Sequence, residues 1–255
     1  MISHNIPKLN KSQIKYIKSL HHKKFRWENQ QFLIEGQKLV NETLRDKPEI
    51  INYIIICEDY ELSSISKGIK IYKTDHDVLK NIGELKTNNT VIAVCDFFEL
   101  NNTALNFQND FSFYLDNIND PGNFGTIVRT ADWFGIKTIF CSPHSVEKYN
   151  HKLIQAAKGS LLRVDIKQIE LENFIRLYPD TAIYGATMDG QSIFQCDIKS
   201  GLFVLGNEAN GIDIKNQKFI KGNISIPRSA NSGAESLNVA MSASIIAAEL
   251  FRKKN

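Results

Sequence analysis

Asn123, which could cap a helix, and Arg129, which could bind an anionic group, lie in the first of three polar segments of this sequence. Asn123 follows an Asp-Pro-Gly turn and lies near a predicted helix start, where its side chain can cap free backbone N–H groups. Arg129 lies six residues further on, and a guanidinium can hold a phosphate or a carboxylate in a fork of N–H donors. A helix cap and a surface ion pair would explain the same two residues without any chemistry.

The second and third polar segments could form the walls of a ligand pocket. Gly206 and Glu208 follow an apolar strand, where glycine permits close approach of a ligand to the backbone and the carboxylate supplies an acceptor. Glu235, Ser236 and Asn238 lie in the first turn of a predicted final helix, and polar groups at a helix N-terminus can form a pocket floor. An ordinary strand exit and a well-capped helix are the structural alternatives for these segments.

Apolar runs rich in β-branched residues alternate with helical patterns along the chain, which predicts an α/β protein with a mostly parallel sheet covered on both faces. The asparagine-rich stretch 99–110 has no clear period and predicts a boundary near residue 105, between domains 1–105 and 106–255. The predicted strands are 31–34, 53–57, 69–72, 90–96, 111–115, 138–141, 182–186, 202–205 and 224–226; the predicted helices are 12–20, 37–45, 75–81, 124–134, 151–158, 171–178 and 235–252.

Ligands of parallel α/β sheets bind at the carboxyl ends of the strands. The loops after Leu115, Ala186, Leu205 and Ile226 are therefore the expected binding loops, and they include the three polar segments. Neither GxGxxG nor GxxxxGK[ST] occurs in the chain, which disfavours a nicotinamide-linked oxidoreductase and a phosphate-loop enzyme.

Composition indicates a globular protein, with 42% hydrophobic and 23% charged residues, enough apolar material for a core. No apolar run is long enough to span a bilayer, and we expect a cytoplasmic protein that does not contact a membrane. The cysteines, at positions 57, 95, 141 and 196, have no CxxC spacing and are interpreted as buried apolar residues in a reducing compartment. No histidine pattern matches a known metal motif, so we expect no metal.

The net charge of +3 is too small to imply nucleic-acid binding, but its distribution is uneven. Residues 1–27 contain no acidic residue, and Phe25 and Trp27 could stack on bases beside a basic surface. An amphipathic helix with a solvated basic face explains the same stretch. The candidate RNA-binding residues are Lys8, Lys11, Lys15, Lys18, Lys23, Lys24 and Arg26.

Taken together, the three polar segments resemble the three motifs of the SpoU/TrmH branch of the SPOUT RNA methyltransferases. The resemblance covers about residues 111–251. A weaker resemblance, in Lys23-Lys-Phe-Arg and Phe32-Leu-Ile-Glu-Gly-Gln-Lys-Leu-Val, indicates a small ribosomal-protein-like α/β substrate-binding domain in front. The matching motifs are Asp120-Pro-Gly-Asn-x-Gly-Thr-Ile-x-Arg-Thr-Ala, Leu205-Gly-Asn-Glu-x-x-Gly and Ile226-Pro…Glu-Ser-Leu-Asn-Val.

The resemblance implies a C-terminal α/β domain with a deep trefoil knot that binds S-adenosylmethionine, and a homodimer with the catalytic site near its interface. The segment between Ile226-Pro227 and Glu235 is longer than in many relatives, and Arg228 stands where an apolar residue is common. The residues that the resemblance assigns to the cofactor are Thr187, Leu205, Gly206, Asn207, Glu208, Gly211, Ile226, Ser236 and Leu237.

The implied reaction is methyl transfer to a ribose 2′-hydroxyl of ribosomal or transfer RNA, with ribosomal RNA favoured by the N-terminal domain. The resemblance makes Arg129 the main catalytic residue, supported by Asn123, Ser236 and Asn238. Because a guanidinium is always protonated, we expect Arg129 to grip the phosphate beside the target ribose rather than act as a base.

Two alternatives stay open at this point. A related enzyme could methylate a base nitrogen, although the joint presence of Asn123, Arg129 and the Glu-Ser-Leu-Asn run favours ribose. A non-catalytic RNA- or ribosome-binding protein could retain the same fold.

Overall fold

The structure, a computed structural model, describes residues 6–60, 68–85, 87, 90–100 and 105–254, and the chain divides into two compact units. The N-terminal unit comprises Met1–Glu99 with Tyr149–Gln155, and the C-terminal unit comprises Leu100–Lys148 with Ala156–Asn255. Of the predicted boundary stretch 99–110, residues 101–104 lie outside the described residues. Within the described ranges, no helix has both the length and the apolar character that crossing a bilayer requires.

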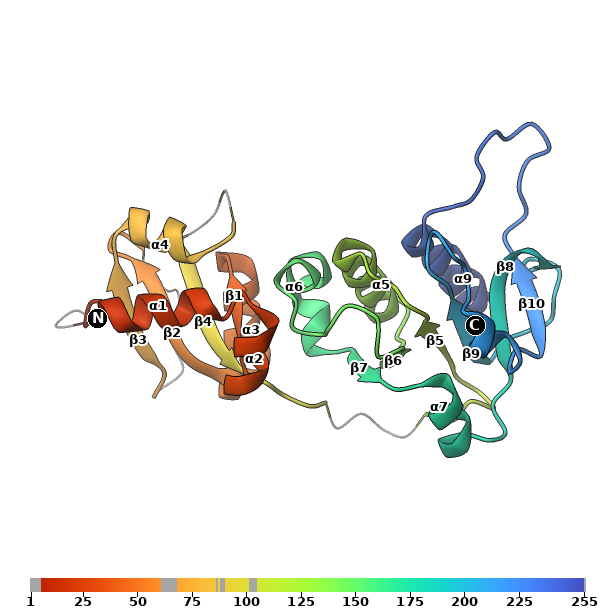
Figure 1. Ribbon diagram of the computed structural model, residues 1–255, viewed down its shortest axis with the longest axis horizontal. Coiled ribbons are helices and arrows are strands. Elements are labelled where there is room, and N and C mark those ends of the chain that lie inside the picture. Colours follow the sequence, from red (N-terminus) through yellow and green to blue (C-terminus); the bar gives the residue numbers. More distant parts are fainter. Residues whose placement is uncertain (1–5, 61–67, 86, 88–89, 101–104, 255) are drawn as a thin grey trace. The chain divides into compact units, whose positions relative to one another are not determined.

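A four-stranded mixed sheet in the order β1-β4-β2-β3 forms the centre of the N-terminal unit (Figure 1). Strands β1 and β2 run antiparallel to β4, whereas β2 and β3 are parallel. The elements are α1 (Lys11–Ser19), α2 (Lys23–Asn29), β1 (Gln31–Glu35), α3 (Gln37–Asp46), a 3₁₀ turn (Pro48–Ile50), β2 (Ile51–Cys57), β3 (Lys70–Thr74), α4 (His76–Ile82) and β4 (Val91–Asp96).

Helix α1 covers this sheet with its apolar stripe and leaves its lysines outside. Ile17 and Leu20 are buried against Ile55 and Val94 of the sheet. The helix begins at Lys11 because Asn10 and Gln13 form a capping box, in which each side chain accepts the other's backbone N–H at 2.9 Å.

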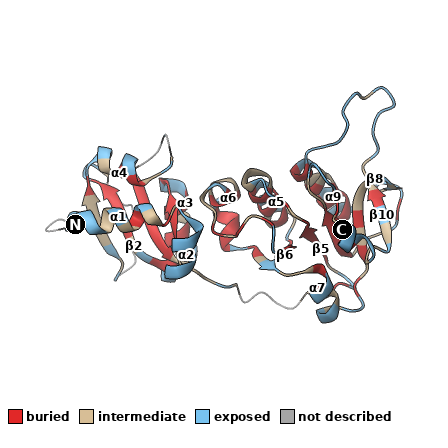
Figure 2. Cartoon of the chain, viewed as in Figure 1, coloured by how far each residue is buried: buried red, intermediate tan, exposed pale blue. Residues whose placement is uncertain are grey.

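All six strands of the C-terminal unit are parallel, in the order β10-β8-β9-β5-β6-β7. Strands β5 and β9 are buried along their whole length, as continuous apolar runs are when a parallel sheet is covered on both faces (Figure 2). The elements are β5 (Phe111–Leu115), α5 (Pro121–Trp133), β6 (Thr138–Cys141), a 3₁₀ turn (Lys158–Leu162), β7 (Asp165–Gln168), α7 (Leu171–Leu177), β8 (Ile183–Ser192), β9 (Gly201–Leu205), α8 (Ile214–Gln217), β10 (Gly222–Ser225) and α9 (Val239–Lys254). Helix α6 (His151–Ala157) is divided between the units, because its residues up to Gln155 belong to the N-terminal unit.

The strand order reverses beside β5. From β5 the chain winds outward through β6 and β7, and then crosses to the other side of β5 for β8, β9 and β10. Ligands of open parallel sheets bind at such a reversal, outside the carboxyl ends of the strands. Leu115 and Leu205 pair as the last residues of β5 and β9, so the loops that follow these strands start side by side.

The predicted α/β class with a parallel sheet is confirmed, and all four cysteines are buried as predicted. Three short elements were missed: α2 has no clear apolar period, β7 is polar over most of its four residues, and α8 is a single turn. The predicted helix 235–252 was wrong at its start, because α9 begins at Val239 and residues 235–238 lie in the preceding loop.

Candidate active site

The loop after β5 is fixed by Asp120, which caps α5. Its Oδ1 accepts the backbone N–H of Asn123 at 2.6 Å, and Pro121 occupies the start of the helix, where no N–H is needed. The prediction that Asn123 itself caps the helix was therefore wrong, because Asp120 takes that place. This leaves both polar atoms of the Asn123 side chain available for contacts with other loops.

Asn123 joins the three predicted motif loops. Its Nδ2 donates a hydrogen bond of 2.6 Å to Oε1 of Glu208, in the loop after β9. Its Oδ1 accepts a hydrogen bond of 2.9 Å from Nδ2 of Asn238, immediately before α9. Three side chains distant in sequence therefore form one network at the carboxyl edge of the sheet.

The loop after β9 closes on itself. The backbone N–H of Asn207 donates to the carbonyl of Gly211 at 2.9 Å, and the N–H of Gly211 donates back at 2.8 Å. A Cβ on Gly206 would lie 2.3 Å from the carbonyl carbon of Gly211, so a side chain at position 206 is incompatible with this closure. Gly211 has a φ of +66°, a left-handed conformation that favours glycine. The Nδ2 of Asn207 also donates to the carbonyl of Asn117 at 2.9 Å, which ties the loop to the β5 exit.

The third loop ends in an asparagine cap. Oδ1 of Asn238 accepts the backbone N–H of Ala240 at 2.9 Å and of Met241 at 3.3 Å, which starts α9 at Val239. Earlier in the same loop, Nη1 of Arg228 donates to the carbonyl of Ala234 at 3.0 Å and closes the segment 228–234.

These loops and the end of β8 enclose a pocket of about 630 Å³. Its volume suits a nucleoside-sized ligand, and its walls include the apolar side chains of Ile212, Ile224 and Ile246. The hydroxyl Oγ1 of Thr187 is buried and has no hydrogen-bond partner among the residues that the structure describes, so it is able to donate to or accept from a ligand. All nine residues that the resemblance assigned to the cofactor line this pocket: Thr187, Leu205, Gly206, Asn207, Glu208, Gly211, Ile226, Ser236 and Leu237.

Sequence reasoning missed several lining residues. Met188 and Asp189 lie in the part of β8 that extends beyond the predicted strand 182–186. Asp189 adds a second carboxylate to the pocket lining, in addition to that of Glu208. Ser242 and Ile246 lie on α9. Their four-residue spacing puts both on one face of the helix. The sequence shows this spacing, but only the structure shows that this face lines a pocket.

The four predicted catalytic residues are only partly brought together within this chain. Ser236 lines the pocket, Asn123 bonds to the lining residue Glu208, and Asn238 bonds to Asn123. Arg129 lies on the exposed side of α5 and is not part of the lining. Six residues of α-helix correspond to about 1.7 turns, so Arg129 and Asn123 face different sides of α5.

The N-terminal basic stretch is largely exposed. Six of its seven predicted RNA contacts, Lys8, Lys11, Lys15, Lys18, Lys23 and Lys24, are exposed, but Arg26 is only 4% exposed. Nη1 of Arg26 donates to the carbonyls of Leu20 and His21 at 2.9 and 2.8 Å. The assignment of Arg26 to RNA was therefore wrong, because its guanidinium holds the turn between α1 and α2.

The aromatic neighbours and one lysine of this stretch have partners of their own. Trp27 is 46% exposed and makes an edge contact with Phe97 at a ring distance of 5.5 Å. Nζ of Lys8 lies 2.6 Å from Oε1 of Glu58, and this hydrogen bond and charge raise the pKa of Lys8.

Comparison with known proteins identifies the family. Residues 110–248 match the SpoU rRNA Methylase family, and residues 11–93 match the MRM3-like substrate binding domain. The chain is 30% identical over 239 residues to the 23S rRNA (guanosine(2553)-2′-O)-methyltransferase RlmP of Bacillus subtilis (strain 168), covering 92% of this chain and 94% of the relative. The chain therefore belongs to the SpoU rRNA methylase family, and the family predicted from the three motifs is confirmed.

Solved structures share the fold over nearly the whole chain. A TrmH-family protein from Porphyromonas gingivalis has a TM-score of 0.83 and 30% identity, covering 96% of this chain and 98% of that one. The AdoMet-bound rRNA methyltransferase from Sinorhizobium meliloti has a TM-score of 0.82 and 24% identity, covering 97% of each chain. The second likeness is one of fold alone.

Proposed function

We propose that this chain is an S-adenosylmethionine-dependent methyltransferase that modifies a ribose 2′-hydroxyl of ribosomal RNA. The observation that carries the proposal is the network of Asn123, Glu208 and Asn238 at the rim of the pocket. The B. subtilis relative is named as a 23S rRNA 2′-O-methyltransferase, and the S. meliloti structure contains the cofactor. Both support the proposal.

The residues of the pocket fit the cofactor. Leu205, Ile226 and Leu237 offer apolar contacts to adenine, and the Thr187 hydroxyl lacks a hydrogen-bond partner in the described ranges of the chain. The closed loop 206–211 presents backbone groups that can read the adenine edge. S-adenosylmethionine bound there would supply an activated methyl group on a sulfonium.

The protein's own part is to position the nucleophile and assist the loss of its proton. Asn123 orients Glu208 and Asn238 through the two bonds described above, and Ser236 adds a hydroxyl at the pocket. The guanidinium of Arg129 grips the RNA phosphate beside the target ribose, where its charge favours alkoxide character at the 2′-oxygen.

Because Arg129 lies away from the pocket of its own chain, we include a homodimer in the proposal, in which a second copy completes the site. Exposed apolar side chains on α5 and α9 support such an interface: Trp133 is 84% exposed, Met241 57% and Phe251 44%. Apolar side chains that gather on a surface mark interaction sites. We also retain the trefoil knot as a proposal for the threading of the C-terminal segment.

We further propose that residues 1–105 bind the RNA and residues 106–255 carry the reaction. The match to a substrate binding domain and the exposed lysines of α1 and α2 support this assignment. Ribosomal rather than transfer RNA is favoured by the same domain. A cytoplasmic location is part of the proposal, supported by four buried cysteines that form no disulfide.

Mapping of 2′-O-methylated nucleotides in total RNA, from cells with and without the gene, tests the proposal. We expect one ribosomal 2′-O-methylation to disappear and to return with the wild-type gene but not with Arg129→Lys. Loss of a base methylation would support the base-modifying alternative. An unchanged methylation map would support the non-catalytic alternative.

A further inference from the structure

The parallel strands β2 and β3 bring three side chains of different types together at one edge of the N-terminal sheet. Cys57, the last residue of β2, pairs with Thr74, the last residue of β3. Asp59 lies two residues beyond Cys57, and His76 lies two residues beyond Thr74, at the start of α4. The backbone N–H of Glu58 donates to the carbonyl of Thr74 at 3.1 Å, so the two exits stay side by side.

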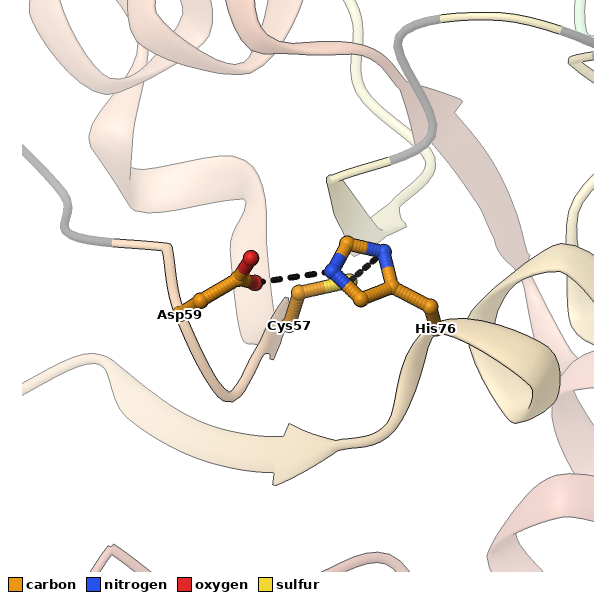
Figure 3. Close-up of side chains that lie close together, drawn as sticks. All are labelled: Cys57, Asp59 and His76. Atoms are coloured by element: carbon orange, nitrogen blue, oxygen red, sulfur yellow. Dashed lines mark hydrogen bonds and ion pairs between the residues drawn. The ribbon is translucent and has the colours of Figure 1, made fainter.

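The three side chains form one cluster (Figure 3). Nδ1 of His76 lies 3.2 Å from Sγ of Cys57, and its Nε2 lies 2.9 Å from Oδ1 of Asp59. One ligand atom from each residue, a sulfur, a nitrogen and an oxygen, lies within 4.8 Å of the others. The cysteine is buried, whereas the histidine and aspartate side chains are 60% and 73% exposed, so the cluster opens to solvent on one side.

We propose that Cys57, Asp59 and His76 bind a Zn²⁺ ion. Thiolate, imidazole and carboxylate are the three ligand types that Zn²⁺ takes in proteins, with bonds of about 2.3 Å to sulfur and about 2.0–2.2 Å to nitrogen and oxygen. With such bonds, the ligand atoms of a tetrahedral site lie roughly 3.3–3.8 Å from one another. The three ligand atoms of the cluster lie within 4.8 Å of one another, so the widest separation must shorten by about 1 Å. The exposed side chains of His76 and Asp59 can move to reach the ion. One imidazole nitrogen of His76 then binds the metal instead of its present partner, and the other nitrogen faces solvent.

Two acidic neighbours among the described residues have other partners, so the proposal assigns three described side chains to the ion. Glu58 is paired with Lys8 at 2.6 Å, and Asp75 accepts the N–H of Val78 at 2.8 Å as the cap of α4. The open side of the cluster leaves a fourth position to water, as four-coordinate Zn²⁺ requires.

A nucleophilic cysteine is the competing interpretation of the same contacts, because histidine joins the thiol to a carboxylate. Cys57 is 0% exposed. A buried sulfur favours a small ion over a bulky substrate as its partner, because an ion needs contact only with the three ligand atoms. The proposal departs from the expectation of no metal, which rested on sequence spacing alone.

Bound Zn²⁺ would tie the end of β2 to the start of α4. Because an ion that binds only the folded protein stabilises it, the midpoint of thermal unfolding is expected to rise with Zn²⁺ concentration. Mg²⁺, which prefers oxygen ligands, is expected to have no such effect.

Metal titration of the full-length protein tests the proposal. Protein stripped with a chelator is titrated with Zn²⁺ in competition with a chromophoric chelator, and with Co²⁺ in an absorption experiment that reports a thiolate ligand by charge transfer. We expect one ion per chain and a thiolate band that Cys57→Ser abolishes. Asp59→Asn and His76→Gln should weaken Zn²⁺ binding by more than the roughly 10–100-fold that loss of an outer-shell group costs.

Matched variants separate the cluster from surface effects. Asp77→Asn alters an exposed aspartate in the first turn of the same helix, and His22→Gln alters an exposed histidine of the same unit; both should bind Zn²⁺ as the wild type does. Unchanged affinity in His76→Gln and Asp59→Asn, or Co²⁺ binding without the thiolate band, would overturn the proposal. If Cys57→Ser does not fold, the Zn²⁺ affinities of His76→Gln and Asp59→Asn decide the question.

Discussion

Asn123 and Glu208 are 85 residues apart in sequence, and the side-chain amide of Asn123 donates a 2.6 Å hydrogen bond to the Glu208 carboxylate. This bond joins the exits of two adjacent parallel strands, β5 and β9, at the point where the strand order reverses. Asn238 extends the network to the start of α9. The pocket rim is therefore built by side chains that only the folded sheet brings together.

Asn123→Asp tests this network. The substitution replaces the donor with a carboxylate beside Glu208, so an attraction becomes a repulsion. Since hydrogen bonds to charged groups contribute roughly 1.5–3 kcal/mol, we expect methyl transfer to fall by at least about tenfold. Asn119→Asp makes the same chemical change in the loop just before α5, at an exposed residue outside the network, and should leave the rate unchanged. Equal rates for the two variants would contradict the role of Asn123.

Gly206→Ala tests the closure of the second motif loop. The new Cβ would meet the Gly211 backbone at 2.3 Å, and overpacking of this kind costs about 1–3 kcal/mol. We expect calorimetry to show weakened S-adenosylmethionine binding, because the loop must open to make room for the alanine side chain. Gly233→Ala is the control, since a Cβ there meets nothing within 4 Å. Wild-type affinity in Gly206→Ala would show that the loop tolerates opening.

Thr187→Val separates a role in binding from a role in folding. The buried hydroxyl has no partner within the described part of the chain, so its removal should leave the free energy of unfolding unchanged or raise it. A hydrogen bond to the cofactor contributes about 0.5–1.5 kcal/mol, which predicts a roughly 2- to 10-fold higher dissociation constant for S-adenosylmethionine. Reduced stability with unchanged affinity would assign the hydroxyl to the fold instead.

Lys11, Lys15 and Lys23 test the basic surface of the N-terminal unit. We expect their combined replacement by glutamine to weaken RNA binding and to reduce its salt dependence by about 0.7–0.9 in log–log slope for each lost phosphate contact. The same replacements at Lys167, Lys199 and Lys218 in the C-terminal unit are the control. An unchanged slope in the first triple variant would remove α1 and α2 from the RNA interface.

The three motifs predicted much of the pocket because each directly follows a strand. The resemblance of these motifs to those of a known family assigned Thr187, Gly206 and Ser236 to the cofactor without knowledge of contacts. Asp189 and Ile246 could not, because the length of β8 and the inward face of α9 are set by packing rather than by local pattern.

Other features depended on pairing or on competition between local caps. Cys57 and His76 are 19 residues apart, and only the parallel register of β2 and β3 brings them together. The start of α9 was placed too early because Asn238, rather than an earlier residue, caps the helix. By contrast, the six-residue spacing of Asn123 and Arg129 was enough to predict that they face different sides of a helix.

Methyl transfer by the purified chain tests the central claim most directly. Ribosomal RNA transcribed without modification is incubated with the protein and methyl-labelled S-adenosylmethionine, then digested to nucleosides and analysed by mass. The account predicts label on a ribose 2′-oxygen with wild-type protein and loss of most turnover in Arg129→Lys, which retains RNA binding. Label on a base, or near-normal transfer by Arg129→Lys, would contradict it.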